Sequence, residues 1–376
     1  MSLPPEHQRL ARLAPLTEIH AHLWTLAPVA ARSIDVVAAA GRVLAADVAV
    51  PAPVPVTSVA LRDGWAVQSA TVADAGPYTP LALVPAPAWV ETGAPVPHPA
   101  DAVLAPDAMT VSGDMAEALA PAGPGADVLG PGEDASSGHV LRHAGERLRN
   151  IDIAALRAAG IPRIKVHEPR VRIFSANRLI DAVDDTVAPL LAHAVDAAGG
   201  APTVERATGE GHSLKDALLG DDADAVIAIG GTGAGRHDGS VRTLAHIGRV
   251  DIHGMGVRPG ETAAMGSVGP RPVLLLPGRL DAALAIWLVV GQQLLKRLTG
   301  LSATEPSAKT VLARKIISTI GLAEVVLVGH CDGGVEPLAS GYFPLQSLTR
   351  ATGWVLVPPE SEGFAAGATV DLRPLP

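Results

Sequence analysis

The stretch AVIAIGGTGAGRHDGS, residues 225–240, sets the architecture of this chain. Its first five residues form an unbroken apolar run, which is typical of a strand buried on both faces of a parallel sheet. Glycines then crowd the turn, and helical spacing resumes near Val241. A glycine-rich turn into a helix exposes backbone N–H groups, to which anions and phosphates bind. The alternative interpretation is a tight strand-to-helix turn without a ligand.

The turn differs from two common nucleotide-binding loops. It is not a dinucleotide fingerprint, because the third glycine of G-x-G-x-x-G falls on Arg236 or Asp238. No Gly-Lys-Ser/Thr follows, so it is not a Walker A loop either. Asp238 could hold a metal or polarise a phosphate, and His237 could move a proton. The alternatives are a capping carboxylate and a solvated loop histidine.

Six further segments form, together with this turn, one ordered set of motifs. They are GRVLAADVAVPAPVP at 41–55, RDGWAV at 62–67, ETGAPVPHPADAV at 91–103, GEDASSG at 132–138, VRPGE at 257–261 and LLPGRL at 275–280. In order and spacing the set resembles the molybdopterin molybdenumtransferases, of the MoeA and gephyrin E-domain type. The resemblance extends from about residue 25 to the C-terminus.

Proline, glycine and apolar spacing predict a multidomain α/β protein. Residues 169–300 alternate strands and helices and form the expected doubly wound α/β domain, which the resemblance makes molybdopterin-binding. Residues 1–48 and 135–168 form an N-terminal helical and extended domain, with helical patterns over 15–48 and 147–160. A β-rich module, 49–134, is inserted in it. Residues 301–376 form a small β-barrel-like domain.

Composition limits the class of protein. The chain has 376 residues, a net charge of −9 and no long basic run, which argues against a nucleic-acid partner. No apolar run reaches the length of a membrane-spanning helix, and the N-terminus lacks a signal core, so no membrane partner is expected. Cys331 is the only cysteine, so we expect a cytoplasmic protein without an intrachain disulfide.

The resemblance implies a set of site residues. Asp63, Thr92, Asp134 and Asp238 occupy catalytic positions, and Asp134 and Asp238 would hold Mg²⁺. Each aspartate has the alternative role of capping a turn. The residues implied in binding the substrate are Gly230, Gly231, Thr232, Gly233, Gly235, Arg258, Pro259, Gly260, Pro277 and Gly278. The arginines among the motif residues could instead be solvated surface side chains.

The chain also departs from the family pattern. Where the family has S-T-G-D-E-L, residues 175–180 read SANRLI, so an Asp-Glu pair is lost. Glu261 replaces a basic residue, which reverses a charge beside the expected phosphate site. Arg279 and Leu280 replace Asn-Pro. His20 and His22 lie two apart, which does not favour a shared metal on a helix.

The expected activity is the insertion of molybdate into adenylylated molybdopterin, with release of AMP and with Mg²⁺ assistance. The alternative is a non-catalytic paralogue that binds molybdopterin or the finished cofactor and delivers it to a client molybdoenzyme. The loss of the Asp-Glu pair favours this alternative, and the retained aspartates favour the enzyme. The resemblance also implies a homodimer.

Overall fold

The computed structural model describes residue 8 and residues 10–176, 186–207, 213–235, 238–302 and 307–376. The chain divides into two compact units. Unit 1 comprises Met1–Ala46, Ala144–Asn150 and Lys165–Pro376, and unit 2 comprises Asp47–His143 and Ile151–Ile164. The four-domain division expected above is finer than this one and stays a prediction.

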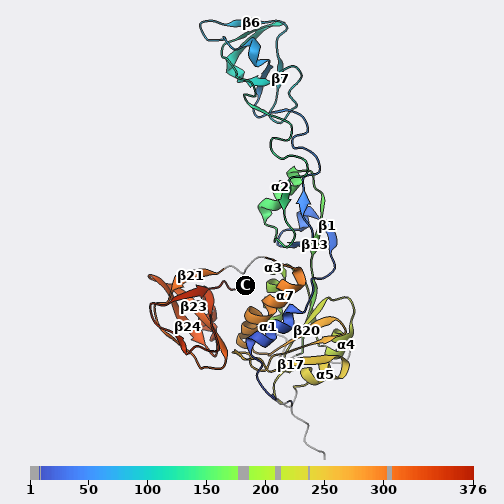
Figure 1. Cartoon of the computed structure of the whole chain (residues 1–376), viewed down its shortest axis with the longest axis vertical. Helices are drawn as coiled ribbons and strands as arrows, with labels where there is room; N and C mark the ends of the chain where they lie inside the picture. Colours follow the sequence, from blue (N-terminus) through green and yellow to red (C-terminus); the bar gives the residue numbers. More distant parts are fainter. Residues whose placement is uncertain (1–7, 9, 177–185, 208–212, 236–237, 303–306) are drawn as a thin grey trace, which may run out of the picture. The chain divides into compact units, whose positions relative to one another are not determined.

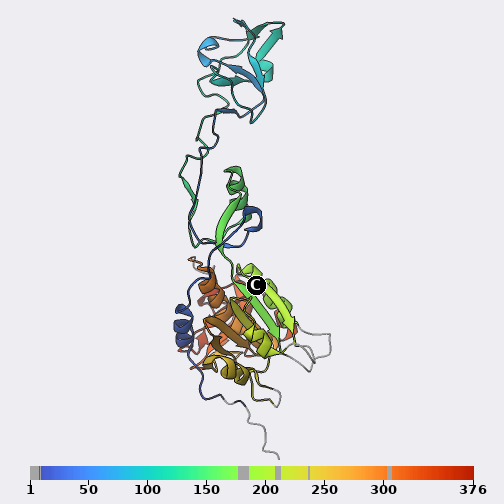
Figure 2. The same cartoon turned by 90° about the vertical axis from the view of Figure 1, so that its right-hand side faces the viewer.

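A six-stranded sheet forms the centre of unit 1 (Figures 1 and 2). Its strands, in spatial order, are β15 (Ala201–Arg206), β14 (Arg170–Ser175), β16 (Ala225–Ile229), β20 (Arg271–Leu276), β19 (Ala264–Val268) and β17 (Arg249–His253). The first four are parallel, whereas β19 runs antiparallel to both of its neighbours. Strand β17 therefore points the same way as β20.

Helices cover both faces of this sheet (Figure 1). Ile227 and Ile229 pack into a core with α1 (Leu16–Trp24), α3 (Val187–Ala197), α6 (Leu280–Ile286), the π-helical turn η4 (Trp287–Gly291) and α7 (Gln292–Thr299). Val226 and Ala228 face the other core, with α4 (Leu214–Leu219) and α5 (Ser240–Ile247). Successive side chains of β16 thus enter opposite cores. The predicted multidomain α/β class, with a doubly wound domain, is confirmed.

The helical prediction for residues 15–48 is correct only at α1. Beyond it the chain forms β1 (Arg32–Asp35), the 3-10 turn η1 (Val36–Ala38) and β2 (Val43–Leu44). The β-branched residues in this segment favour strands. The Asp35 carboxylate accepts the N–H of Val37, and Gly41 adopts φ +79°, which ends helical geometry. Strand β13 (Arg163–His167) lies between β1 and β2.

The C-terminal part of unit 1 is built from strands around a small aliphatic core (Figure 1). Strand β23 (Ala323–Cys331) pairs with β24 (Gly334–Ser340), β25 (Gly353–Val357) and β18 (Val257–Arg258). The remaining elements are β21 (Ala308–Val311) with β27 (Thr369–Leu372), β22 (Ile316–Ile317) with β26 (Gly363–Phe364), and α8 (Leu345–Leu348). Strand β18 joins this region to the loop between β17 and β19.

Unit 2 is β-rich, as expected for residues 49–134. One sheet has the order β7-β5-β8 and another β6-β10-β9, and two further pairs are β11-β4 and β12-β3. The bounds are β3 (Val48–Ala49), β4 (Val59–Ala60), β5 (Gly64–Val67), η2 (Ser69–Thr71), β6 (Leu81–Leu83), β7 (Ala88–Val90), β8 (Ala102–Leu104), η3 (Pro106–Ala108), β9 (Met109–Ser112), β10 (Met115–Ala118), β11 (Val128–Leu129), β12 (Val140–Arg142) and α2 (Asn150–Ala158). Helix α2 lies where the sequence predicts a helix.

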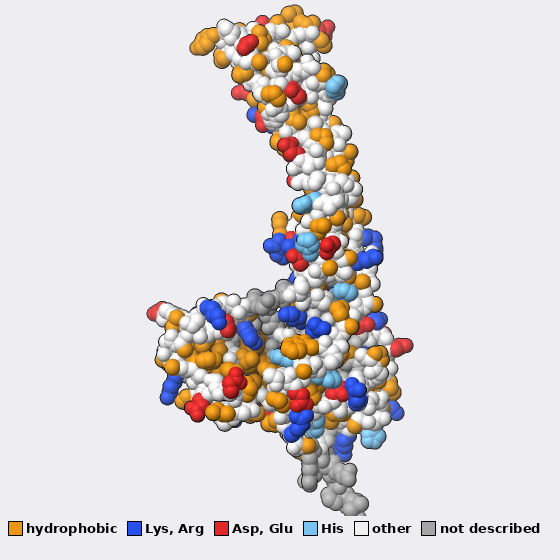
Figure 3. All heavy atoms as spheres, in the orientation of Figure 1, with side chains coloured by type: hydrophobic (Ala, Val, Ile, Leu, Met, Phe, Trp, Pro, Cys, Tyr) orange, Lys and Arg blue, Asp and Glu red, His pale blue; other side chains and the backbone are white. Residues whose placement is uncertain are grey.

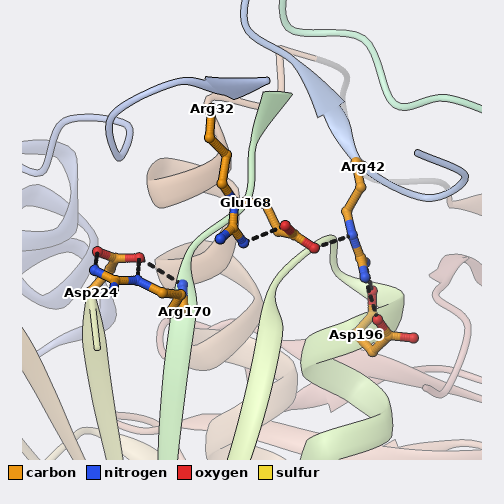
Figure 4. A network of polar contacts seen from close by, with 6 residues as sticks. All are labelled: Arg32, Arg42, Glu168, Arg170, Asp196 and Asp224. Carbon is orange, nitrogen blue, oxygen red and sulfur yellow. Dashed lines mark hydrogen bonds and ion pairs between the residues drawn. The ribbon is translucent and has the colours of Figure 1, made fainter. Parts of the chain in front are cut away.

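Ion pairs tie the N-terminal segment of unit 1 to the amino ends of the parallel strands (Figure 4). The Glu168 carboxylate, just before β14, pairs with Arg32 and, at 2.7 Å, with the Nε of Arg42. Arg170 at the start of β14 pairs with Asp224 just before β16, at 2.9 Å. This polar network lies at the edge of the sheet opposite the glycine-rich turn.

Removing Glu168 tests how much this network contributes to the free energy of unfolding. Its side chain is 14% exposed, so Glu168→Ala leaves two arginines without their shared acceptor. We expect the free energy of unfolding to fall by about 1–3 kcal/mol in urea titrations. The matched control is Asp196→Ala, which removes a 59% exposed partner of Arg42 and should cost less than about 1 kcal/mol. Equal losses in the two variants would contradict this assignment.

Candidate functional site

The glycine-rich turn follows β16 directly, and its backbone geometry requires glycine. Gly230 and Gly231 adopt φ +95° and +75°. A Cβ on Gly231 would lie 2.4 Å from the Oγ of Ser240, the first residue of α5. The Ser240 hydroxyl donates to the Gly230 carbonyl at 2.7 Å, and the Ser240 N–H donates to the Gly231 carbonyl at 3.0 Å. The turn is therefore fastened to the start of α5.

Gln8 holds this turn from the N-terminal segment. Its side chain is buried, with the residue 7% exposed. Its Nε2 donates to the carbonyls of Gly231 and Gly233, both at 2.9 Å. Its Oε1 accepts the N–H groups of Val241 and Arg242 at the start of α5, both at 3.1 Å. One side-chain amide thus fixes both the turn and the helix terminus.

The direction of these hydrogen bonds leaves donors free. In a planar trans peptide, C=O and N–H point in opposite directions. The carbonyls of Gly231 and Gly233 face Gln8, so the N–H groups of Thr232 and Ala234, in the same peptides, point away from it. Within the described ranges, the N–H groups of Gly231, Thr232 and Gly233 donate to no acceptor. Such a run of donors beside a helix N-terminus is suited to an anion.

Asp238 lies against the turn rather than in a metal cluster. Its Oδ2 accepts the N–H of Gly235 at 2.8 Å. This oxygen therefore caps the turn, which is the alternative role considered for Asp238. Its Oδ1 accepts no hydrogen bond from the described residues. No group of three or more His, Cys, Asp or Glu side chains that could share a metal ion occurs in the described part of the chain.

Three of the sequence motifs meet at the carboxyl edge of the sheet. Strands β16, β17 and β20 point the same way, so their carboxyl ends lie at one edge of the sheet. That edge carries the glycine-rich turn, the loop 254–263 between β17 and β19, and residues 277–279 after β20. The Gly230 N–H donates to the Leu276 carbonyl at 2.8 Å. The hydroxyls of Thr232 and Thr262 are 3.0 Å apart, and His253 Nε2 lies 3.2 Å from the Thr232 carbonyl.

Exposure differs among the expected binding residues at this edge. Arg258 and Gly278 are exposed, whereas Pro259, Gly260 and Pro277 are buried. The two prolines and Gly260 therefore shape the loops.

Two arginines at this edge have acidic neighbours. The Glu261 Oε2 accepts the Gly260 N–H at 3.0 Å, and Glu261 lies 3.9 Å from Arg258. Arg279 forms an ion pair with the buried Asp281 at 2.5 Å and lies over the ring of Tyr342. The hydrogen bonds that Arg279 donates to the Asp281 carboxylate raise the pKa of Arg279, so this guanidinium is held as a cation.

In unit 2, the structure brings together Asp63 and Thr92. The Asp63 Oδ1 accepts the Thr92 N–H at 2.7 Å and the Thr92 hydroxyl at 2.8 Å. These two bonds, the backbone one first, lower the pKa of Asp63 below its ordinary value of 3.8. Both residues are exposed. Asp134 is exposed in a turn, where its N–H donates to the Val54 carbonyl at 3.1 Å.

The remaining candidates are placed as follows. His20 lies 3.3 Å from the Val289 carbonyl and His22 pairs with Asp251 at 3.4 Å, so the two rings have separate partners. The sequence departures at Asn177–Ile180, together with Arg236 and His237, lie outside the described residues.

Surface charge offers no broad attraction for an anion on the face drawn in Figure 3, where acidic and basic side chains alternate. Binding of an anion therefore depends on local groups such as the free N–H donors of the turn. Within the described ranges, no helix is both long and apolar enough to cross a membrane.

The motifs did not point to two other features of this region. Gln8 precedes the first helical pattern, and nothing in its neighbourhood signals a buried amide. Glu324 and Tyr342 come from the C-terminal strand region, far along the chain from the turn. The pairing of β18 with β23 brings that region to the same loop.

Two protein-family models match the chain. "MoeA N-terminal region (domain I and II)" matches residues 8–160, and "Probable molybdopterin binding domain" matches residues 171–297. Together they cover about three quarters of the chain.

Curated relatives match over most of the chain. Molybdopterin molybdenumtransferase 2 of Mycobacterium tuberculosis is 26% identical over 382 residues, covering 90% of this chain and 94% of the relative. Molybdopterin molybdenumtransferase of a Nostoc species is 27% identical, covering 79% and 76%. A crystal structure of a molybdopterin biosynthesis MoeA protein from Pyrococcus horikoshii matches with a TM-score of 0.75 at 25% identity, covering 96% of this chain and 99% of that one.

The Asp63–Thr92 contact predicts a measurable titration. The folded-state pKa of Asp63 is lowered, so its contribution to stability is present above pH 3.8 and is lost as the pH falls through the folded value. Thr92→Val removes the hydroxyl donor and keeps the backbone donor. We expect the pKa of Asp63, followed by carboxyl ¹³C NMR, to rise part of the way toward 3.8.

Asp101 supplies the internal reference for this titration. Its pKa is lowered by bonds from Ser69, in the same unit, and should be the same in both proteins. An unchanged titration of Asp63 in Thr92→Val would contradict the contact.

Proposed function

This chain belongs to the MoeA-type family of molybdopterin molybdenumtransferases, and on that premise we propose that it inserts molybdate into adenylylated molybdopterin and releases AMP. Its role is in molybdenum cofactor biosynthesis. The observation that carries the proposal is the run of free N–H donors at Gly231, Thr232 and Gly233, at the edge where three motifs converge. Such donors suit the phosphate that joins the pterin to AMP.

The residues at this edge have different proposed roles. The turn would hold the phosphate through main-chain donors, which side-chain changes elsewhere leave intact. Arg279, held as a cation, can neutralise the charge that develops on the phosphate or on molybdate. Arg258, exposed at the end of β18, is available to another part of the ligand. Gln8 acts through the turn, because its amide bonds the turn carbonyls and the N–H groups at the start of α5.

Asp238 fits a role with Mg²⁺ through one oxygen. A Mg²⁺ ion in such sites takes one or two carboxylates together with substrate phosphates and water. The free Oδ1 of Asp238, beside the free N–H donors, meets this requirement, whereas the Oδ2 stays engaged with Gly235. When bound, the ion would neutralise charge on the phosphates as their bond breaks. For Asp134 the proposal rests on the motif alone.

Asp63 and Thr92 form the second part of the proposal. Their direct contact keeps Asp63 ionised and fixes its orientation. An ionised, exposed carboxylate can position a cation or a water molecule. We assign these two residues and Asp134 to the catalytic set, as the family motifs imply.

The non-catalytic alternative is not favoured. Relatives named molybdopterin molybdenumtransferase match along nearly the whole length of the chain. Delivery of the finished cofactor to a client molybdoenzyme would be a later step of the same proposal, and the single cysteine suits a cytoplasmic location.

The purified chain, mixed with adenylylated molybdopterin, molybdate and Mg²⁺, should release AMP. We expect Asp238→Asn to lower this rate by about 100-fold or more, because an amide replaces the charge that the ion requires. The fold should be retained in circular dichroism. Asp332→Asn is the control, because it removes one charge at an exposed loop of unit 1. Absent AMP release by the wild type would refute the proposed function, and wild-type rates in Asp238→Asn would refute the role of Asp238.

We also propose a homodimer, as the family resemblance implies. Light scattering at micromolar concentration should then give twice the chain mass of 38.3 kDa. A mass of one chain over the same range would contradict it.

A further inference from the structure

Glu324 is a buried carboxylate without a partner. It is the second residue of β23 and is 6% exposed. Within the described residues it forms no hydrogen bond and no ion pair. Because no donor of the described residues engages them, the carboxylate oxygens of Glu324 are available to a ligand that brings donors of its own.

Glu324 and Arg258 both lie beside Gly341. The parallel register of β18 and β23 places Arg258 opposite Glu324. A Cβ on Gly341 would lie 3.4 Å from the Nε of Arg258 and 3.7 Å from the Oε1 of Glu324. Gly341 has φ +67°, a conformation that favours glycine, so no side chain projects from this position toward Arg258 and Glu324. No ion pair joins Arg258 to Glu324. Arg258 lies 3.9 Å from Glu261 instead, and Glu324 keeps its hydrogen-bonding capacity.

Arg258 belongs to the same loop that reaches the proposed phosphate site. Arg258 begins the segment that reaches Thr262, whose hydroxyl is 3.0 Å from that of Thr232 in the turn. Arg279, which follows β20 at the same edge, lies over the ring of Tyr342, next in sequence to Gly341. A ligand whose phosphate binds the turn can therefore extend along this loop toward Glu324.

The neighbouring carboxylate of Glu324 and guanidinium of Arg258 match the pyrimidine edge of a pterin. That edge carries two adjacent donors, the ring N3–H and the 2-amino group, and one neighbouring acceptor, the 4-oxo group. A carboxylate accepts two parallel donors, and an arginine donates to a ring carbonyl. The same pairing distinguishes bases in nucleic acids, where carboxylates accept from amino groups and arginine donates to the oxygen of guanine.

We propose that Glu324 is the residue that recognises the 2-amino-4-oxo edge of the pterin, with Arg258 donating to the 4-oxo group. This inference rests on the proposed function, because it takes the ligand to be a pterin. It makes Glu324 a binding residue that sets specificity, without a part in breaking bonds.

The test compares a pterin with an analogue that differs only at this edge. In 6-hydroxymethyllumazine a 2-oxo group replaces the 2-amino group, so a carboxylate faces an oxygen instead of a donor. Fluorescence titrations of the full chain should show 6-hydroxymethylpterin binding about tenfold or more tighter than the lumazine. Glu324→Gln should remove this preference, because an amide both donates and accepts.

Two further variants separate recognition from stability. Glu324→Asp keeps the charge but retracts it, so binding of the pterin should weaken while the preference over the lumazine persists. Glu336→Gln is the matched control, because Glu336 pairs with Gly329 in the same sheet, about 16 Å along β23 from Glu324. It should leave both affinities unchanged. Melting temperatures confirm that each variant is folded.

The outcomes distinguish this inference from the proposed function. Equal affinity of the wild type for the two compounds, or an unchanged preference in Glu324→Gln, would overturn the inference even if the wild type releases AMP. A wild type that binds neither compound would also overturn it. The AMP-release assay then decides separately whether the proposed function stands.

Discussion

Burial of β16 on both faces is the constraint from which the other features follow. Ile227 and Ile229 enter one core, and Val226 and Ala228 enter the other, so the strand offers no surface for chemistry along its length. A ligand can approach only at the strand ends, and in parallel sheets the carboxyl ends are where loops gather. The glycine-rich turn, the loop 254–263 and residues 277–279 therefore lie at one edge.

The chemistry at that edge depends more on the backbone than on side chains. The net charge of the chain is −9, and Glu261 stands where a basic residue would attract an anion. Backbone N–H donors do not change when side chains are substituted. Gln8 holds the carbonyls of Gly231 and Gly233 and so fixes the peptides that carry the Thr232 and Ala234 N–H groups. This arrangement explains how an acidic chain with altered motifs can retain an anion site.

Sequence reasoning predicted the strand-turn-helix at residues 225–240, because local periodicity encodes it. The family resemblance, and not periodicity, assigned residues of the turn, of 258–260 and of 277–278 to one binding set. It also put Asp63 and Thr92 in one catalytic set with Asp134 and Asp238, and the structure places Asp63 and Thr92 in contact. Sequence reasoning overestimated helix over residues 15–48, where β-branched residues and Gly41 favour strands and turns. Gln8 and Glu324 escaped notice, since their contacts join segments far apart in the chain and no periodic pattern encodes them.

The most direct measurement is the response of the turn amides to the product nucleotide. In amide NMR of the full chain titrated with AMP and Mg²⁺, we expect saturable shifts of the Gly231, Thr232 and Gly233 N–H signals, of the size expected when a phosphate accepts them. Amides at the opposite edge of the sheet, such as those of Arg170 and Asp224, should stay unchanged. Saturable binding of AMP that leaves the three turn amides unshifted, or no binding up to millimolar AMP, would contradict the claim that this turn is the phosphate site.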